Sequence, residues 1–392
     1  MTRDDLREEV LRSSANNILC ELPTGVGKSK IAIDFIKGRY KKGNKILIVI
    51  PKLVLIENWK EEFKKWQCEG MLGGVVFTTY ISYPKHVGEW DFVVYDEAHH
   101  LTERCYDALS LPEMKVKYNI LLSATVGYNK RTDFKYFFRN LEIFKVGVRK
   151  TIDEDILPDP RVYLIPLKLD NTIADLEIVK NSKCKQFVVV KYADRYKYSK
   201  VTNMKVIIKC TQQQYYDNIC SLINYYKFRS HNRQFMELYL RECGTRLKWL
   251  SNEKTSIVRQ ILKVLDNKRT LTFCNSILQT EVLGKYCINS KNKDSMKHLT
   301  MFNEGKVNHI TSVAILDEGM NLTDCEVGVF AMLNSSDRII LQRLGRLLRH
   351  KNPAIVIPYY VNTREEEIVS KMLQDYNPEL VTTVDNIKDL KI

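Results

Sequence analysis

A glycine-rich stretch near the amino terminus constrains the fold of this chain more than any other feature. Residues 21–29 read ELPTGVGKS, follow a short apolar run at 18–20 and precede a second apolar run at 31–36. This order predicts a buried strand, a tight turn and a helix. The glycines let the backbone N–H groups converge, and the helix start adds the positive end of its dipole. The stretch predicts a phosphate-binding loop, the alternative being a plain strand–turn–helix corner.

The residues of this loop have separate expected tasks. The Lys28 ammonium can reach the β- and γ-phosphates of a nucleotide, and the Ser29 hydroxyl can bind Mg²⁺. Leu22 stands where the general pattern has its first glycine, which is a departure from it. The predicted nucleotide-binding residues are Pro23, Thr24, Gly25, Val26, Gly27, Lys28 and Ser29.

A second signal is an acidic pair that follows the apolar run at 92–95. A buried strand would deliver both carboxylates to its carboxyl end. Asp96 can hold Mg²⁺ through water opposite Ser29, and Glu97 can orient and deprotonate an attacking water. An acidic turn at a strand end is the alternative, and the phosphate loop earlier in the chain argues against it.

The first half alternates short apolar runs with helical patterns, which favours an α/β fold. Such continuous apolar strands are typical of a parallel sheet buried on both faces, and sites in these sheets form at the carboxyl ends of the strands. The expected strands are 18–20, 46–50, 75–77, 92–95 and 120–122, and the expected helices include 3–14, 31–36 and 53–66.

Length and composition predict two domains. A chain of 392 residues suits two domains of roughly 150–200 residues each. Charges and prolines at 149–160 predict a linker. We therefore expect a first domain at 1–150, a linker at 151–160 and a second domain at 161–392, with an inserted or elaborated segment at about 170–260.

The formal net charge of +14 predicts a polyanionic partner, with nucleic acid the first candidate and a solvated basic surface the alternative. The ten cysteines include no Cys-x-x-Cys pair, so neither a zinc site nor a redox motif is indicated. Several cysteines, such as Cys20 and Cys274, lie inside apolar runs, which favours reduced thiols and a reducing compartment, the cytoplasm. No run of eighteen apolar residues is present, so we expect no membrane span.

The second half is less regular. We expect a strand at 162–167, at a sheet edge or irregular because it contains Pro166. Strands are expected at 186–191 and 205–210. The basic and aromatic residues between them could clamp a single strand, but a β-hairpin with a solvated basic face is the favoured interpretation. Helices are expected over 211–265, and strands at 270–274 and 309–313.

Four motifs resemble those of the superfamily 2 helicases and translocases, in the DEAH form. The layout is closest to the compact phage UvsW-type helicases. This resemblance implies two RecA-like domains, each a mostly parallel sheet flanked by helices, with ATP in the cleft between them and nucleic acid across both. The motifs, in order, are Pro23–Ser29, Asp96–His99, Ser123–Thr125 and Gln342–Arg349.

The resemblance gives roles to further residues. On a helix expected from about 338 to 349, Gln342 would position the water or the γ-phosphate, and Arg346 and Arg349 would act as arginine fingers. His99, Ser123 and Thr125 would couple the nucleotide state to the second domain. Contacts to the nucleic-acid backbone would come from Pro51, Lys52, Thr78, Thr79, Asn275, Ser276, Thr311 and Ser312, although Asn275 and Ser276 could equally be helix caps.

Two positions depart from the family pattern. Leu6 lies where a glutamine would read adenine, and Asn321 where an aspartate would meet the ribose. We expect a nucleic-acid-stimulated ATPase that uses ATP and Mg²⁺ as a helicase or translocase. DNA is favoured over RNA on the resemblance alone. The alternatives are a duplex-DNA translocase without strand separation, an RNA helicase and an ATP-switched nucleic-acid clamp. A phage-encoded protein acting in the host cytoplasm would fit the layout, with targeting by protein partners or by residues 170–260.

Overall fold

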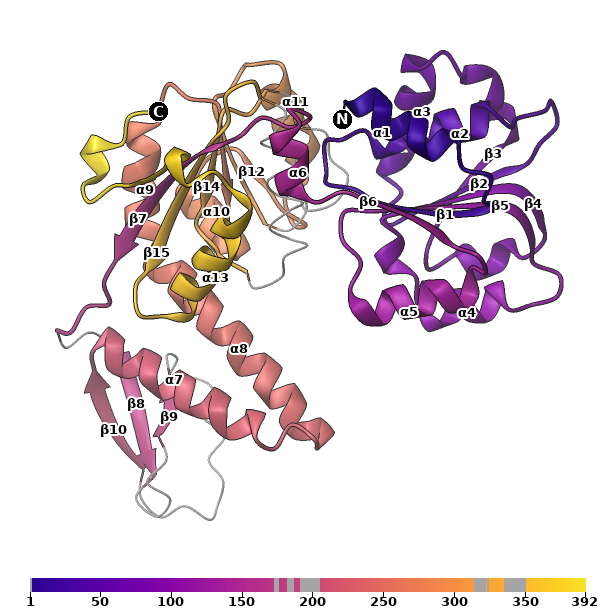
Figure 1. Cartoon of the computed structure of the whole chain (residues 1–392). Coiled ribbons are helices and arrows are strands. Elements are labelled where there is room, and N and C mark those ends of the chain that lie inside the picture. Colours follow the sequence, from indigo (N-terminus) through magenta and orange to yellow (C-terminus); the bar gives the residue numbers. More distant parts are fainter. Residues whose placement is uncertain are drawn as a thin grey trace.

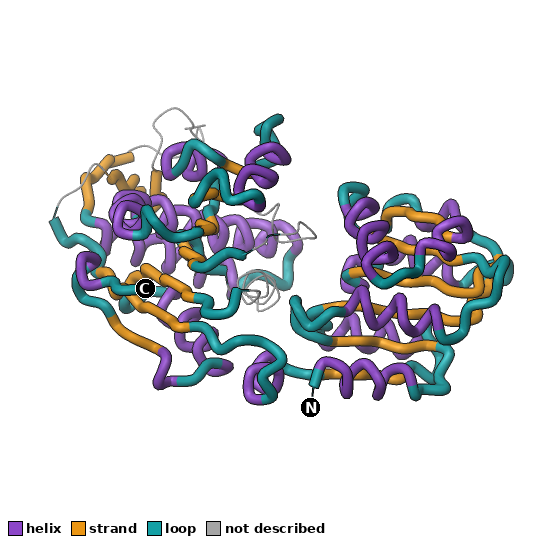
Figure 2. Tube along the Cα trace, turned by 90° about the horizontal axis from the view of Figure 1, so that it is seen from above, coloured by secondary structure: helices purple, strands orange, loops and turns teal. Residues whose placement is uncertain are grey.

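The computed structural model describes residues 2–172, 176–181, 187–190, 205–313, 322, 324–334 and 350–392. These residues form two parallel sheets, each flanked by helices, and a smaller antiparallel sheet (Figure 1). Seen from above, the two larger sheets belong to separate lobes that the chain joins (Figure 2). The observed architecture confirms the expected α/β fold.

The first sheet has six parallel strands in the order β3-β2-β4-β5-β1-β6. β2 is a fully buried apolar run and β4 is buried over residues 92–95, as a sheet covered on both faces requires. Its strands are β1 (Asn17–Glu21), β2 (Ile46–Ile50), β3 (Val75–Thr79), β4 (Glu89–Asp96), β5 (Lys115–Ser123) and β6 (Glu142–Lys145).

Six α-helices accompany this sheet, three of which match the expected helices. The apolar faces of the first five pack on the two sides of the sheet in two separate clusters of buried side chains. The six are α1 (Arg3–Leu11), α2 (Lys28–Lys37), α3 (Leu55–Lys65), α4 (Glu103–Leu109), α5 (Tyr128–Phe137) and α6 (Val148–Asp153). α6 overlaps the start of the expected linker, where Thr151 and Ile152 are buried.

The second sheet has seven parallel strands in the order β12-β13-β11-β14-β15-β7-β16. Of the two alternatives expected for residues 162–167, an edge or an irregular strand, the edge position is wrong, because β7 pairs with β15 on one side and with β16 on the other. The pairing with β16 ends at Leu164, so Pro166 lies beyond it and need not donate there. The strands are β7 (Arg161–Leu167), β11 (Thr270–Phe273), β12 (Cys287–Ile288), β13 (His309–Ser312), β14 (Val327–Phe330), β15 (Ala354–Tyr360) and β16 (Val381–Thr383).

The helices around the second sheet are short. The two long helices of this half belong to the segment between β7 and α9, described below. Ser276 caps α10 by accepting a hydrogen bond from the backbone N–H of Gln279, at 3.2 Å. The helices are α9 (Thr255–Val264), α10 (Ile277–Leu283), α11 (Ser295–Asn303) and α13 (Arg364–Met372).

Between β7 and α9 the chain forms a separate unit of three strands and two long helices (Figure 1). We call α7 (Gln212–Lys227) and α8 (Arg233–Glu253) the arm. The small sheet has the order β10-β8-β9, so the expected hairpin between 186–191 and 205–210 is wrong. The strand β8 (Leu176–Asn181) lies between β9 (Phe187–Val190) and β10 (Lys205–Cys210). The basic and aromatic residues 191–200 lie outside the described residues.

The arm is anchored on the second sheet by apolar and polar contacts. Trp249 and Leu250 are buried in one cluster with Tyr360, the last residue of β15. The Tyr216 hydroxyl accepts a hydrogen bond from the backbone N–H of Arg364, at 2.7 Å. Among the described residues, no helix is long and apolar enough to cross a membrane.

Candidate nucleotide and nucleic-acid site

The phosphate loop lies between the end of β1 and the start of α2, as predicted. Gly25 and Gly27 have φ of 95° and 100°, a left-handed conformation that favours glycine, and Gly27 is the N-cap of α2. The Lys28 ammonium donates to the carbonyl of Leu22 across the loop, at 3.0 Å. The buried Thr24 hydroxyl has no hydrogen-bond partner among the described residues. An anion receiving bonds from this loop would fit both observations.

The acidic pair lies at the end of β4. Glu97 adopts the left-handed conformation (φ 52°, ψ 56°), a strained geometry for a residue with a side chain. The Asp96 carboxylate accepts a hydrogen bond from the Trp59 indole, at 3.0 Å, and the Asp96 carbonyl accepts one from the Tyr80 hydroxyl, at 2.7 Å. Removal from bulk water, and then the neighbouring Glu97 carboxylate, raise the pKa of Asp96 to about 6.

This donor set fits a magnesium ion. A carboxylate whose pKa is raised by burial and a like charge gains from a nearby cation, and hard oxygen donors suit Mg²⁺. The described residues contain no cluster of three or more His, Cys, Asp or Glu side chains that could hold a metal ion. Mg²⁺ commonly takes one or two protein ligands together with substrate phosphates, so Ser29 and Asp96 suffice.

A chain of polar contacts connects the acidic pair to the next strand. His99 Nδ1 lies 3.5 Å from a Glu97 carboxylate oxygen and 3.1 Å from the Ser123 hydroxyl. The Ser123 hydroxyl donates to the carbonyl of Thr125, at 2.8 Å. Because β4 and β5 are paired, their carboxyl ends bring Glu97, His99, Ser123 and Thr125 together.

Sequence reasoning missed three residues that organise this site. Trp59 and Tyr80 hold Asp96, and Glu21 holds the loop after β5. The buried Glu21 carboxylate pairs with Arg131 and with Lys145, and accepts a hydrogen bond from the backbone N–H of Val126, at 3.4 Å. A charged residue at the end of an otherwise apolar strand was the one available signal for Glu21.

The first sheet also brings two predicted nucleic-acid segments to the same edge. Pro51 and Lys52 follow β2, Thr78 and Thr79 end β3, and the two strands are paired neighbours. Lys52 is exposed, whereas Thr78 is buried and its hydroxyl has no partner among the described residues.

The second sheet brings Asn275 and Ser276, which follow β11, beside Thr311 and Ser312, which end β13. The Asn275 side-chain nitrogen and the Ser312 hydroxyl have no partner among the described residues. Thr311 and Ser312 are both buried, but the Thr311 hydroxyl already donates to the carbonyl of Thr280, at 3.1 Å, so its proton is used inside the domain. Gln342, Arg346, Arg349 and Asn321 lie outside the described residues.

Comparison with known proteins finds matches for both halves of the chain. Residues 4–127 match the family described as type III restriction enzyme, res subunit, and residues 253–351 match the helicase conserved C-terminal domain. The chain is 22% identical over 375 residues to the DNA 3'-5' translocase XPB2 of Sulfurisphaera tokodaii, a match that covers 91% of this chain and 78% of that protein.

Solved structures agree on the fold. The S. cerevisiae Dbp5 structure with RNA and ADP BeF3 superposes with a TM-score of 0.60 and 12% identity, covering 97% of this chain and 89% of that one. The Hef helicase domain of Pyrococcus furiosus superposes with a TM-score of 0.50 and 13% identity, covering 95% and 97%. Two RecA-like domains and these two family matches define the class, an ATP-hydrolysing helicase or translocase. In both halves the chain is similar to proteins of superfamily 2.

Proposed function

We propose that this protein is a DNA-stimulated ATPase that moves along DNA as its two domains close and open. The observation that carries the proposal is the contact chain from Glu97 through His99 to Ser123 and Thr125. It connects the residue best placed to act on water with the loop that follows β5. A change at the γ-phosphate can therefore be passed to neighbouring segments of the chain.

In this proposal the residues of the first domain bind and orient the substrate ATP. The loop from Pro23 to Ser29 cradles the phosphates with backbone N–H groups, and Lys28 exchanges its bond to the Leu22 carbonyl for phosphate oxygens. Glu97 orients the attacking water and accepts its proton. Bound Mg²⁺, held by Ser29 and Asp96, would offset the negative charge of the phosphates.

The second domain, which we place at 161–392 after a linker at 151–160, would complete the site. On the family resemblance, Gln342 orients the water or the γ-phosphate, while Arg346 and Arg349 offset the charge that develops in the transition state. If nucleic acid, which we call the track, bridges both domains and draws them together, these side chains reach ATP only when the track is bound. Hydrolysis would then depend on nucleic acid.

The track would contact both sheets without base readout. Pro51, Lys52, Thr78 and Thr79 would meet it on the first domain, and Asn275, Ser276 and Ser312 on the second. DNA is proposed over RNA because the relative matched over 91% of this chain is a DNA translocase. The RNA-bound Dbp5 structure favours RNA as the second candidate. We keep the DEAH form of Asp96–His99 and the phage-type layout as parts of this proposal.

The place of action would be a reducing compartment such as the cytoplasm. All nine cysteines of the described part of the chain are free thiols, and seven of them are buried. Free, inert thiols of this kind persist where disulfides are kept reduced.

The test is the steady-state ATPase rate without nucleic acid and with single-stranded DNA, duplex DNA, forked DNA or RNA. Wild type would be compared with Arg349→Ala and with the control Arg364→Ala, whose side chain forms a surface ion pair with Glu367. We expect strong stimulation by DNA that is lost in Arg349→Ala by a factor of about 10³ or more and kept in the control. Equal rates with and without every polymer would contradict the proposal and favour an ATP-switched clamp.

A further inference from the structure

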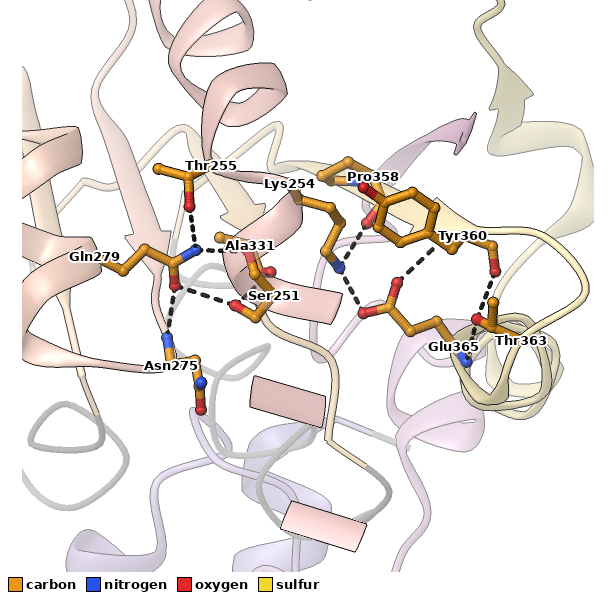
Figure 3. A network of polar contacts seen from close by, with 10 residues as sticks. All are labelled: Ser251, Lys254, Thr255, Asn275, Gln279, Ala331, Pro358, Tyr360, Thr363 and Glu365. Carbon is orange, nitrogen blue, oxygen red and sulfur yellow. Dashed lines mark hydrogen bonds and ion pairs between the residues drawn. The ribbon is translucent and has the colours of Figure 1, made fainter. Parts of the chain in front are cut away.

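The helix of the arm does not stop where it meets the second domain but bends. Lys254 is at once the last cap of α8 and the first cap of α9, with φ −79° and ψ −7°, so the axis changes direction there. We call Ser251–Thr255 the bend. Ser251 and Lys254 are three residues apart and both are fully buried. A polar pair at such a position needs partners, and each side chain finds them on a different element (Figure 3).

Lys254 fixes the bend on one side. Its ammonium donates to the carbonyl of Pro358 in β15, at 3.1 Å, and pairs with the Glu365 carboxylate of α13, at 2.6 Å. The other Glu365 oxygen accepts the backbone N–H of Tyr360, at 3.0 Å. A buried ion pair contributes little net stability over an apolar pair of equal size. Its geometry, by contrast, is directional, which suits a role in setting the direction of the arm.

Gln279 fixes the bend on the other side. Its side-chain oxygen accepts from the Ser251 hydroxyl, at 3.0 Å, and its amide nitrogen donates to the Ser251 carbonyl, at 2.8 Å, and to the Thr255 hydroxyl, at 3.2 Å. The Ser251 carbonyl lies in the last turn of α8, where the intrahelical partner is missing. Gln279 is only 3% exposed, so these contacts are shielded from water.

The same Gln279 oxygen holds the turn before α10. It accepts the backbone N–H of Asn275, at 2.9 Å, so one atom contacts both the bend and this turn (Figure 3). The Asn275 side-chain nitrogen is buried and has no partner among the described residues. The position of that nitrogen therefore depends on the bond between the Asn275 N–H and Gln279. Gln279 is in turn bonded to Ser251 at the base of the arm.

We propose that Gln279 is a positioning residue for DNA binding, which ties the turn carrying Asn275 to the bend at the base of the arm. The inference rests on the proposed contact between this turn and DNA. Asn275 touches the DNA, and Gln279 acts through it. A displacement of the arm at Ser251 changes the two hydrogen bonds between Ser251 and Gln279. Gln279 then shifts, and the turn that carries Asn275 shifts with it. The inserted unit and the DNA-binding turn thus form one mechanical element.

The test is a double-mutant cycle on the full-length protein. Gln279→Met keeps the length of the side chain and removes all four hydrogen bonds. Ser251→Ala removes the hydroxyl that lies 3.0 Å from both the Gln279 oxygen and the Ala331 carbonyl, and Asn275→Ala removes the amide itself. The probe is a fluorescein-labelled single-stranded DNA, read by anisotropy. The DNA concentration that half-saturates ATPase stimulation gives a second measure. The matched control is Thr363→Val, which loses buried hydrogen bonds in the Glu365 branch of the same network.

We expect Gln279→Met to weaken DNA binding by about five- to tenfold and Ser251→Ala by about two- to threefold, with maximal turnover at saturating DNA retained. In the Asn275→Ala background both effects should vanish. If Gln279→Met does not fold, Ser251→Ala decides the question alone. Thr363→Val should lower the unfolding midpoint and leave DNA affinity unchanged.

Three results would overturn the inference alone. The first is additivity of the Ser251 and Asn275 effects. The second is an equal loss of affinity in Thr363→Val, which would show a general packing effect. The third is weaker DNA binding by Asn275→Ala with unchanged binding by Gln279→Met, which would reject the positioning role and keep the DNA contact. Unchanged affinity in Asn275→Ala would reject the DNA contact at this turn, and the inference with it.

Discussion

The carboxyl ends of the two large sheets differ in the kind of polar group they present. At the first sheet the described residues place a lysine and two adjacent carboxylates within one constellation, Lys28, Asp96 and Glu97. At the second sheet the strand ends carry an amide and hydroxyls, Asn275, Ser276 and Ser312. The buried charges of that domain, Lys254 and Glu365, form an internal pair that contacts β15 at Pro358 and Tyr360.

This difference agrees with a division of labour. Phosphoryl transfer needs charged groups aimed at developing charge, and these must be held by neighbours such as Trp59 and Tyr80. A track that has to be released and bound again needs weaker contacts, because a buried charge pair would hold it too long. Neutral hydroxyl and amide groups give single hydrogen bonds of about 1 kcal/mol each.

The largest expected effect lies at the first sheet. Glu97→Gln removes the proton acceptor and keeps the shape of the side chain, so turnover at saturating DNA should fall by about 10²–10⁴. DNA and ATP binding should persist, because no phosphate or track contact is removed. Steady-state ATPase assays combined with anisotropy measure both. Loss of DNA binding with turnover kept would reverse the roles assigned to the two sheets.

The next effect lies in the buried pair of the second domain. Lys254→Met leaves the Glu365 carboxylate buried without its partner, which should lower the free energy of unfolding by about 3–5 kcal/mol in urea titrations. Adding Glu365→Gln removes the isolated charge and keeps an acceptor for the Tyr360 N–H, so most of the loss should be recovered. If the double variant is no more stable than Lys254→Met, the pair does not behave as a desolvated ion pair.

Much of the first domain could be predicted from sequence, because its signals are local. The strand β2 matches the apolar run 46–50 residue for residue, and the two left-handed glycines lie in the predicted loop. The neighbours of Asp96 could not be predicted. Trp59 precedes it by 37 residues and donates from the buried face of α3, where its position in sequence indicates only a core residue.

The second domain was harder because its features depend on distant partners. β7 was expected to be an edge strand or an irregular one since Pro166 cannot donate, and the short strand β16, more than two hundred residues later, makes it internal. β8 was missed, so β9 and β10 were paired wrongly with each other. Lys254 and Glu365 are 111 residues apart, and nothing in either local sequence indicates that they meet. The positions of Asn275 and Ser312 follow from strand ends, which are local signals.

The two domains should respond oppositely to pH between about 4 and 6.5. Burial lowers the pKa of His309 to about 4, below its usual 6.5, so the unfolded chain binds more protons in this window and stability rises with pH. Burial raises the pKa of Asp96 to about 6, so the folded state binds more protons there and stability falls with pH. Each contribution is about 3 kcal/mol.

Single substitutions separate these two contributions. In the presence of a chelator, His309→Gln should flatten the rise of stability with pH, and Asp96→Asn should steepen it by removing the opposing slope. Unfolding free energies measured at several pH values in both variants give the slopes. Slopes that do not change in either variant would show that other groups govern the response.

The smallest expected effect distinguishes two adjacent residues at the second sheet. Ser312 has a hydroxyl without a partner among the described residues, whereas the Thr311 hydroxyl is already bonded to the Thr280 carbonyl. Ser312→Ala should weaken binding of single-stranded DNA by about two- to fivefold, the cost of one neutral hydrogen bond, and cost little stability. Thr311→Val should do the reverse, because it breaks an internal bond and removes none to DNA. If Thr311→Val weakens DNA binding more than Ser312→Ala does, β13 presents its other face to the DNA. The neutral contact of this strand would then have to be reassigned from Ser312 to Thr311.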